Sequence, residues 1–169
     1  MPYMQYPVIK SYYDKLKKGS IEADVDSLWI NILGLFFTVP RNYGLEQETR
    51  PLTGIKKRAD ISIRYIRNGM LKKVILIEDK RVEFESQSSK WAEAVEQATF
   101  YLALVRKEQK NEKTLYAIAT VGHYSRFYFM EPEDEKLRDY PGTDGRYYEF
   151  KDDEAEIEAL LNELVAKTS

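Results

Sequence analysis

The sequence predicts an α/β protein in which a central mixed β-sheet is flanked by α-helices. Two observations predict this class and its arrangement as one domain. Segments whose apolar residues recur at helical spacing alternate with short apolar segments typical of strands, in the order helix, strands, helix, strands, helix. The 169 residues match the size of one compact domain, and neither a repeat nor a low-complexity linker divides them. We therefore expect residues 1–169 to form a single domain.

The first predicted helix extends from about Ser20 to Phe37. Its apolar residues recur at helical spacing: Ile21, Val25, Leu28, Trp29, Ile32 and Phe36. Gly19 and Ser20 are expected to cap its start, and Pro40 ends it. Its first turns contain acidic residues, which the positive end of the helix dipole favours: Glu22, Asp24 and Asp26.

A β-hairpin follows in the sequence. Residues 59–66 alternate apolar with polar side chains, as a strand with one buried face does. Asn68-Gly69 is a strong signal for a two-residue turn, because both residues tolerate a positive φ. Residues 73–79 contain the unbroken apolar run Val74–Ile77, which is typical of a central strand buried on both faces.

The second half of the chain predicts a helix, a strand pair and a last helix. The helix lies within residues 86–110, and its buried stripe consists of Trp91, Val95, Ala98, Leu102 and Val105. Residues 114–120 and 124–130 form a strand pair that turns at Gly122-His123. The last helix starts near Asp152-Asp153 and buries Ile157, Leu160, Leu161, Leu164 and Val165.

The composition excludes several classes of protein and of metal site. With 43% hydrophobic residues the chain is too apolar for a disordered protein. It has no cysteine and one histidine, His123, so neither a thiolate site nor a typical zinc site is expected. Any bound metal should be a hard cation held by carboxylate oxygens. The net charge of −2 is unlike that of a protein that coats nucleic acid without sequence preference, although a local basic patch remains compatible with it.

The N-terminal residues contain no positively charged segment followed by a long apolar run, and residues 28–39 are too short to span a bilayer. We therefore expect a soluble intracellular protein of the cytoplasm or nucleus, without a membrane partner.

Three charged residues converge at one end of the predicted hairpin. Glu78 and Lys80 lie two positions apart on a strand, so their side chains share a face. Asp60 opens the preceding strand. A strict two-residue turn would set Asp60 opposite Ile77, so placing it on the face of Glu78 needs a one-residue offset from a longer loop or a bulge.

These residue types suit phosphodiester hydrolysis. Asp60 and Glu78 can supply anionic oxygens to Mg²⁺ or Mn²⁺, and the main-chain carbonyl of Asp79 can add a neutral ligand. Lys80 can then orient the attacking water or stabilise developing negative charge. In isolation, Glu-x-Lys at the end of a strand is more often a solvated ion pair; the upstream Asp60 favours a functional interpretation.

Asp60 followed by Glu78-x-Lys80, on a hairpin between two helices, resembles the PD-(D/E)XK nuclease superfamily. The resemblance covers about residues 22–130, and the strand pair 117–122 and 126–128 is similar to a hairpin of fungal and bacterial members. It implies a single nuclease-like domain with a restriction-endonuclease-like core, acting on DNA more readily than on RNA. The chain departs from the family motif at two positions. Ala59 occupies the position of the motif's proline, and Asp79 occupies a position where an apolar residue is usual. Asp79 is either an extra ligand or faces away.

The resemblance also implies supporting residues. Glu22 is the best match to the family's helix carboxylate, bound to the metal directly or through water, and Asp26 is its rival one turn later. Gln97 and Tyr101 match a Gln-x-x-x-Tyr pair on the following helix. Gln97 would contact the substrate or hold Lys80, whereas Tyr101 would bind substrate or simply pack in the core.

Lys56, Lys57 and Arg58 precede Asp60 and form either a phosphate-holding patch or a solubilising loop. His123 is expected to be inert. A homodimer is a further expectation, because cutting two strands needs two sites.

Two other functions remain open at this point. One is a catalytically inactive module that keeps the nuclease fold and binds nucleic acid or a protein partner. The other is a structural domain in which Glu78 and Lys80 merely pair.

Overall fold

The computed structural model describes residues 2–47, 59–110 and 113–169. The helices are α1 (Pro7–Lys15), α2 (Glu22–Phe36), α3 (Ser88–Gln109) and α4 (Glu154–Thr168), with short 3-10 turns at Tyr3–Gln5, Val39–Arg41 and Val82–Phe84. The strands are β1 (Tyr43–Gln47), β2 (Ile61–Arg67), β3 (Met70–Lys80), β4 (Leu115–Val121), β5 (Tyr124–Met130), β6 (Arg138–Asp139) and β7 (Tyr148–Glu149). None of the described helices is long and apolar enough to cross a membrane.

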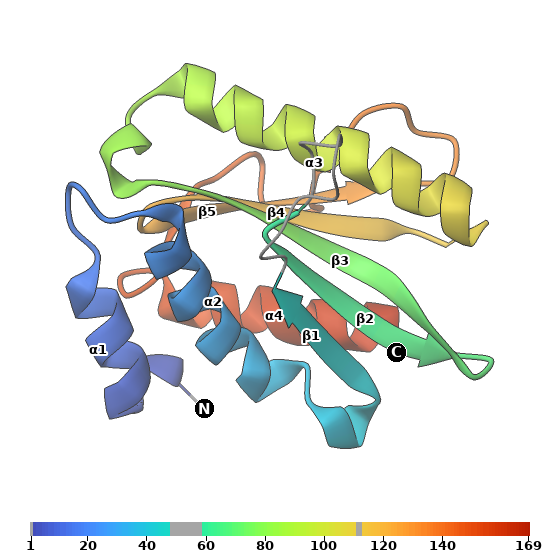
Figure 1. Cartoon of the computed structure of the whole chain (residues 1–169), viewed down its shortest axis with the longest axis horizontal. Coiled ribbons are helices and arrows are strands. Elements are labelled where there is room, and N and C mark those ends of the chain that lie inside the picture. Colours follow the sequence, from blue (N-terminus) through green and yellow to red (C-terminus); the bar gives the residue numbers. More distant parts are fainter. Residues whose placement is uncertain (1, 48–58, 111–112) are drawn as a thin grey trace.

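The strands form one open mixed sheet in the order β1-β2-β3-β4-β5-β6, with β7 also paired to β5. β3 and β4 run parallel and the other described pairs are antiparallel. Helix α3 covers one face of the sheet, and α2 and α4 cover the other (Figure 1). The predicted class, an α/β protein with a mixed sheet flanked by helices, is therefore confirmed.

Each face of the sheet has its own apolar core. Ile61, Ile75 and Ile77 pack toward α2 and α4, whereas Leu76 packs toward α3. β3 lies between β2 and β4 and is buried on both faces from Lys73 to Lys80, as the apolar run predicts. The expected helix stripes are also confirmed, except that Val95 and Val165 are only partly buried and that Ile21 precedes α2 and is exposed.

The β2–β3 hairpin contains the offset that the candidate site requires. Asn68 and Gly69 have φ angles of 51° and 76°, and Arg67 pairs with Met70, so the predicted two-residue turn is confirmed. The register then shifts between Ile63 and Arg64, because a bulge gives β3 one extra residue. Beyond the bulge Ile61 pairs with Ile77, and the next positions in that register are Asp60 and Glu78.

The predicted cap of the first long helix is wrong. The helix begins at Glu22, and the carboxylate of Asp24 accepts a 3.0 Å hydrogen bond from the amide of Ile21. Ser20 instead accepts a hydrogen bond from the amide of Lys17, one turn back. The serine side chain therefore bonds within the loop before the helix, and the carboxylate of Asp24 binds the amide of Ile21, the residue just before α2.

Four elements have no counterpart in the prediction: α1, β1, β6 and β7. Residues 43–47 of β1 contain a glycine and no alternation of apolar and polar side chains, and their strand conformation comes from pairing with β2 at the sheet edge. β6 and β7 have two residues each, which is too short for a periodic signal. Their pairing partners, not their local sequence, determine them.

A substitution at Gly69 tests whether the β2–β3 turn has the assigned backbone conformation. Replacing it with alanine should lower the free energy of unfolding by about 1 kcal/mol, because an L-residue at φ 76° is strained. The matched control is Gly34→Ala in α2, where φ is negative and a new Cβ meets open space. That substitution should stabilise by about 0.5–1 kcal/mol. Chemical denaturation measures both, and equal effects of the two substitutions would contradict the assigned turn.

Candidate metal centre

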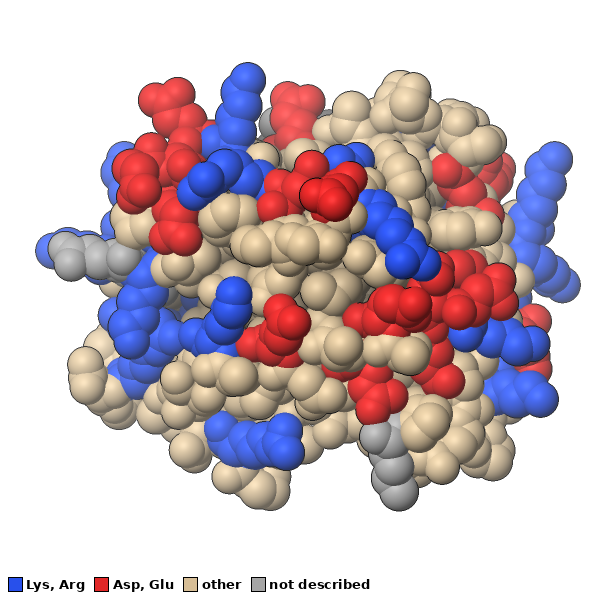
Figure 2. Space-filling view, turned by 180° about the vertical axis from the view of Figure 1, so that it is seen from behind, with Lys and Arg blue, Asp and Glu red and all other residues tan. Residues whose placement is uncertain are grey.

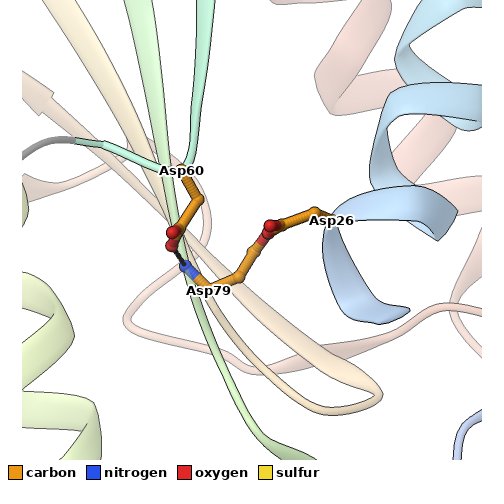
Figure 3. A group of neighbouring side chains, drawn as sticks. All are labelled: Asp26, Asp60 and Asp79. Carbon is orange, nitrogen blue, oxygen red and sulfur yellow. Dashed lines mark hydrogen bonds between the residues drawn. The ribbon is translucent and has the colours of Figure 1, made fainter. Parts of the chain in front are cut away.

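Acidic side chains from three segments meet at the end of β3 that follows Ile77. Asp60 comes just before β2, Glu78 and Asp79 are near the end of β3, and Asp26 projects from α2 toward Asp79 (Figure 3). One carboxylate oxygen each of Asp26, Asp60 and Asp79 lies within 4.8 Å of the other two. Three aspartates that are far apart in the sequence thus form one cluster of carboxylates.

Asp60 is anchored on the backbone of β3. Its Oδ2 accepts a 2.6 Å hydrogen bond from the amide of Asp79 (Figure 3). The N–H and C=O of one strand residue point to the same side, so the Asp79 carbonyl, expected as a ligand, is directed to the Asp60 side of β3. Burial raises the pKa of Asp60 to about 7, with repulsion from Asp26 adding to the shift and the Asp79 amide opposing it.

Glu78 is buried on the α3 side of the sheet, with 6% of its surface exposed. Its Oε2 has no hydrogen-bond partner among the described residues. Burial raises the pKa of Glu78 to about 9; the negative charge of Asp60 adds to the shift and Lys80 opposes it. A buried carboxylate oxygen without a donor is costly, and a bound cation would remove that cost.

Lys80 shares the α3 side with Glu78, as the alternation along the strand predicts. Its Nζ donates hydrogen bonds to Gln97 Oε1 at 2.8 Å and to Glu93 Oε1 at 3.3 Å. Gln97 therefore holds Lys80, one of the two roles expected for it. Glu93 was missed by the sequence reasoning, although it lies one turn before Gln97 on the same helix face and could have been found from that spacing.

Asp79 points to the opposite side of β3, toward α2 (Figure 3). Its side chain is fully buried, and among the described residues its carboxyl oxygens meet no N–H or hydroxyl donor, so the hydrogen bond it makes is with the facing carboxyl group of Asp26. Burial and the facing carboxylate of Asp26 raise the pKa of Asp79 well above its usual value. Burial also raises the pKa of Asp26. Of the two alternatives left open for Asp79, the side chain faces away from Glu78 and Lys80, and it lies near the carboxylates of Asp26 and Asp60; whether it is a metal ligand stays a prediction.

Asp26, the rival helix residue, is the one that joins the three-carboxylate cluster. Glu22 lies one turn earlier and is half-buried, and its charge is close enough to raise the pKa values of both Asp60 and Glu78. The indole Nε1 of Trp29 donates a 2.7 Å hydrogen bond to Thr120 in β4, which pairs with Asp79. This bond fixes α2 on the sheet within one turn of Asp26.

Other predicted residues lie elsewhere. The hydroxyl of Tyr101 is 2.5 Å from Nζ of Lys73, seven positions and about 23 Å along β3 from Lys80. Its role in substrate binding stays a prediction. Lys56, Lys57 and Arg58 lie outside the described residues. His123 bonds through its amide and ring to Glu85.

A cleft of about 820 Å³ lies between α3 and the β5–β7 region. Aromatic side chains line it, including Trp91, Tyr128 and Tyr147. None of the predicted site residues is among its lining residues, and acidic side chains outnumber basic ones there. The carboxylate cluster is therefore separate from this cleft.

The cluster fits a hard divalent cation. Its donors are carboxylate oxygens, which Mg²⁺ and Mn²⁺ prefer, and buried oxygens of Glu78 and Asp79 have no donor among the described residues. Comparison of the chain with family models, with curated proteins and with solved structures gave no match, so the assignment of a metal centre is based on the geometry of these residues.

Proposed function

We propose that this protein is a Mg²⁺- or Mn²⁺-dependent nuclease with a restriction-endonuclease-like core of the PD-(D/E)XK type, hydrolysing phosphodiester bonds in DNA in preference to RNA. The supporting observation is the β2–β3 bulge, which brings Asp60 level with Glu78 while Lys80 shares the face of Glu78. A solvated Glu-Lys pair needs neither this offset nor a half-buried carboxylate as a third group. A nuclease centre needs all three groups in one place.

The residues have distinct roles in this proposal. Asp60, Glu78 and the Asp79 carbonyl hold the cation, and Glu22 or Asp26 completes its surroundings. When bound, the cation neutralises charge on the phosphate and lowers the pKa of a water molecule. Lys80 orients that water or stabilises the developing negative charge, and Gln97 and Glu93 hold its ammonium in place.

The mixed distribution of surface charge indicates that substrate phosphates would bind at the metal and not on a broad basic surface. On the face shown in Figure 2, acidic and basic side chains of the described residues are interspersed, with a net charge of −2 for the whole chain. A protein that coats nucleic acid instead presents a continuous basic area. Substrate phosphates would thus be bound locally, next to the cation.

The direct test is cleavage by the purified full chain. Supercoiled DNA, linear duplex DNA, single-stranded DNA and RNA are each incubated with Mg²⁺, with Mn²⁺ or with EDTA. Cleavage that requires the divalent cation and is lost in Glu78→Ala is the expected result. A protein that cleaves none of these substrates, or whose cleavage survives Glu78→Ala, would refute the proposal. Retained nucleic-acid binding without Mn²⁺ uptake would instead favour the inactive-module alternative.

Gln97 is expected to act as a positioning residue. Gln97→Ala should lower kcat by about 10- to 100-fold, because Lys80 loses its shorter hydrogen bond. Gln97→Glu keeps an acceptor oxygen and should restore part of the rate, which a purely structural role would not predict. Thr99→Ala on the same helix is the control, because Thr99 lines the separate cleft and its hydroxyl donates to the carbonyl of Val95. A kcat unchanged in Gln97→Ala would contradict this role.

A further inference from the structure

The cleft between α3 and the β5–β7 region has the features of a small-molecule binding site. Its volume is about 820 Å³, and its α3 wall extends from Ser88 to Ala103, about four helical turns. Small-molecule sites typically have volumes of about 300–1,000 Å³ and combine apolar and aromatic walls with a few polar groups that orient the ligand. The carboxylates of the candidate metal centre lie outside its lining residues, so the proposed nuclease function does not account for this cleft.

Aromatic rings form much of the wall. Trp91 of α3 and Tyr147, the residue before β7, contact each other edge to face with ring centroids 4.6 Å apart. Tyr128 of β5 is buried in the same wall, whereas Phe100 and Tyr147 are each 44% exposed. A flat ligand would cover this exposed apolar surface by stacking, and every nucleobase has a π-face that stacks on aromatic side chains.

Arg126 of β5 is a polar group of the wall that is fixed in place. Its guanidinium lies over the rings of Tyr128 and Tyr147, 5.4 and 5.3 Å from their centroids. Its Nε and Nη2 donate to Oδ1 of Asp139 at 3.2 and 2.9 Å. Gly145 packs so closely against it that a Cβ there would lie 2.6 Å from Nη2. The guanidinium therefore has one orientation before a ligand binds, which lowers the entropic cost of binding.

The pair of Arg126 and Asp139 offers hydrogen-bond donors beside an acceptor. A guanidinium has five N–H groups. Within the described part of the chain, Arg126 uses two of them on Oδ1 of Asp139 and one, at 3.4 Å, on the hydroxyl of Tyr147. The two side chains line the cleft and are 25% and 41% exposed, so their remaining N–H groups and Oδ2 are accessible to a ligand. The edge of a nucleobase likewise presents acceptors beside donors.

The charges around the cleft favour a ligand without phosphate. The described lining residues include three carboxylates, Glu96, Glu135 and Asp139, and two cations, Arg126 and Lys136. Glu96 and Glu135 are exposed, and Arg126 is already paired with Asp139. A nucleotide would add negative charge to these acidic surroundings, whereas a nucleoside would add none.

We propose that this cleft binds a nucleoside, with its base stacked against the aromatic wall and the edge of the base bonded to Arg126 and Asp139. The site uses no metal ligand and differs in position and chemistry from the carboxylate cluster. The inference goes beyond the proposed nuclease function and does not depend on it, because binding is measured in EDTA and without any nucleic acid.

The experiment titrates the full chain with adenosine, guanosine, cytidine and thymidine in EDTA, and follows heat and tryptophan fluorescence. The chain has two tryptophans, and Trp29 is fully buried and bonded to Thr120, so quenching by a ligand in the cleft should come from Trp91. We expect saturable binding of at least one of these nucleosides. In Trp91→Phe the quenching should disappear, which locates the bound nucleoside.

Substitutions at Tyr147 test the stacking. Tyr147→Ala should bind the nucleoside about 10-fold more weakly, the effect of removing one stacking ring, whereas Tyr147→Phe keeps the ring and should retain most of the affinity. The matched control is Tyr12→Ala, a partly buried tyrosine of α1 that also has a cation, Lys15, over its ring. This control should leave the affinity unchanged. Equal affinities of Tyr147→Ala and the wild type would overturn the proposed position of the base.

A phosphate series tests the charge argument. The 5′-triphosphate of the best nucleoside should bind at least about 10-fold more weakly at low salt, and the difference should shrink as salt is added. Glu96→Gln combined with Glu135→Gln should shrink it too.

Three results would overturn the proposal. The first is that none of the four nucleosides binds, and the second is that the triphosphate binds more tightly than its nucleoside. The third is a dimer that Tyr147→Ala dissociates, which would assign the cleft to a second copy of the chain. Each of these results would leave the nuclease proposal intact, and a protein that binds a nucleoside but cleaves no nucleic acid would reject only the nuclease.

Discussion

Lys80→Met should lower the cation-dependent cleavage rate by about 10²- to 10³-fold, the usual effect of removing one group that stabilises charge in a transition state. Lys80 is the basic side chain that shares the face of Glu78 at the end of β3, and it is only 7% exposed. Methionine retains the length of the side chain but not its charge. Initial rates on the preferred DNA substrate, measured at saturating Mn²⁺, give the effect.

Lys73→Met is a matched control. Lys73 is also a buried lysine of β3, with 9% of its surface exposed, and it too donates to a polar group of α3, the hydroxyl of Tyr101. It differs from Lys80 in being far from the carboxylates. Both substitutions should change stability to a similar degree, but Lys73→Met should leave the cleavage rate within about twofold. Equal losses of activity would show that the effect of Lys80→Met is structural.

The cation-free protein should become less stable as the pH rises from about 4.5 to about 9. The pKa of Glu78 is about 9 in the folded protein, against 4.5 for the ordinary side chain, so the folded state holds its proton more tightly than the unfolded state. Its contribution to stability is fully present below pH 4.5 and is lost as the pH rises through 9. Asp60 adds a loss in the same direction, between about 3.8 and about 7. Denaturation in EDTA at several pH values measures the slope.

Glu78→Gln should remove most of this loss. At pH 8 in EDTA the variant should be more stable than the wild type by about 2 kcal/mol, because its side chain is neutral at every pH, whereas the wild type must take up a proton on folding to keep buried Glu78 neutral. Saturating Mn²⁺ should then stabilise the wild type more than the variant, since a ligand that binds only the folded state adds to its stability. A variant that is less stable than the wild type in EDTA would contradict the assigned environment of Glu78.

Glu149→Gln is the control with the opposite sign. Glu149 is equally buried, at 6% exposed, but its carboxylate accepts hydrogen bonds from Tyr13 and from the amides of Lys151 and Asp152. Losing these charge-assisted bonds should destabilise the protein by about 1–2 kcal/mol in the same buffer at pH 8. The contrast separates a carboxylate that supports the fold from one that the fold leaves without a partner.

Local patterns in the sequence predict most of the sheet and part of the site. The Asn68-Gly69 turn, the buried run of β3 and the shared face of Glu78 and Lys80 follow from backbone preferences and from the two-residue period of a strand. The α3 residue Gln97 follows from helical spacing together with the family resemblance. These features depend on residues that are near one another in the chain.

The sequence by itself therefore determined the hairpin, its buried central strand and the common face of Glu78 and Lys80. Only the tertiary structure decided that a bulge brings Asp60 level with Glu78, that Asp26 rather than Glu22 joins the carboxylate cluster, and that Asp79 turns toward α2. The physical reason is that the bulge depends on how β2 pairs with β3, and that the approach of Asp26 to Asp79 depends on the position of α2 on the sheet, which is set by packing and by the Trp29–Thr120 bond between segments 91 residues apart. No local periodicity encodes a contact over that separation.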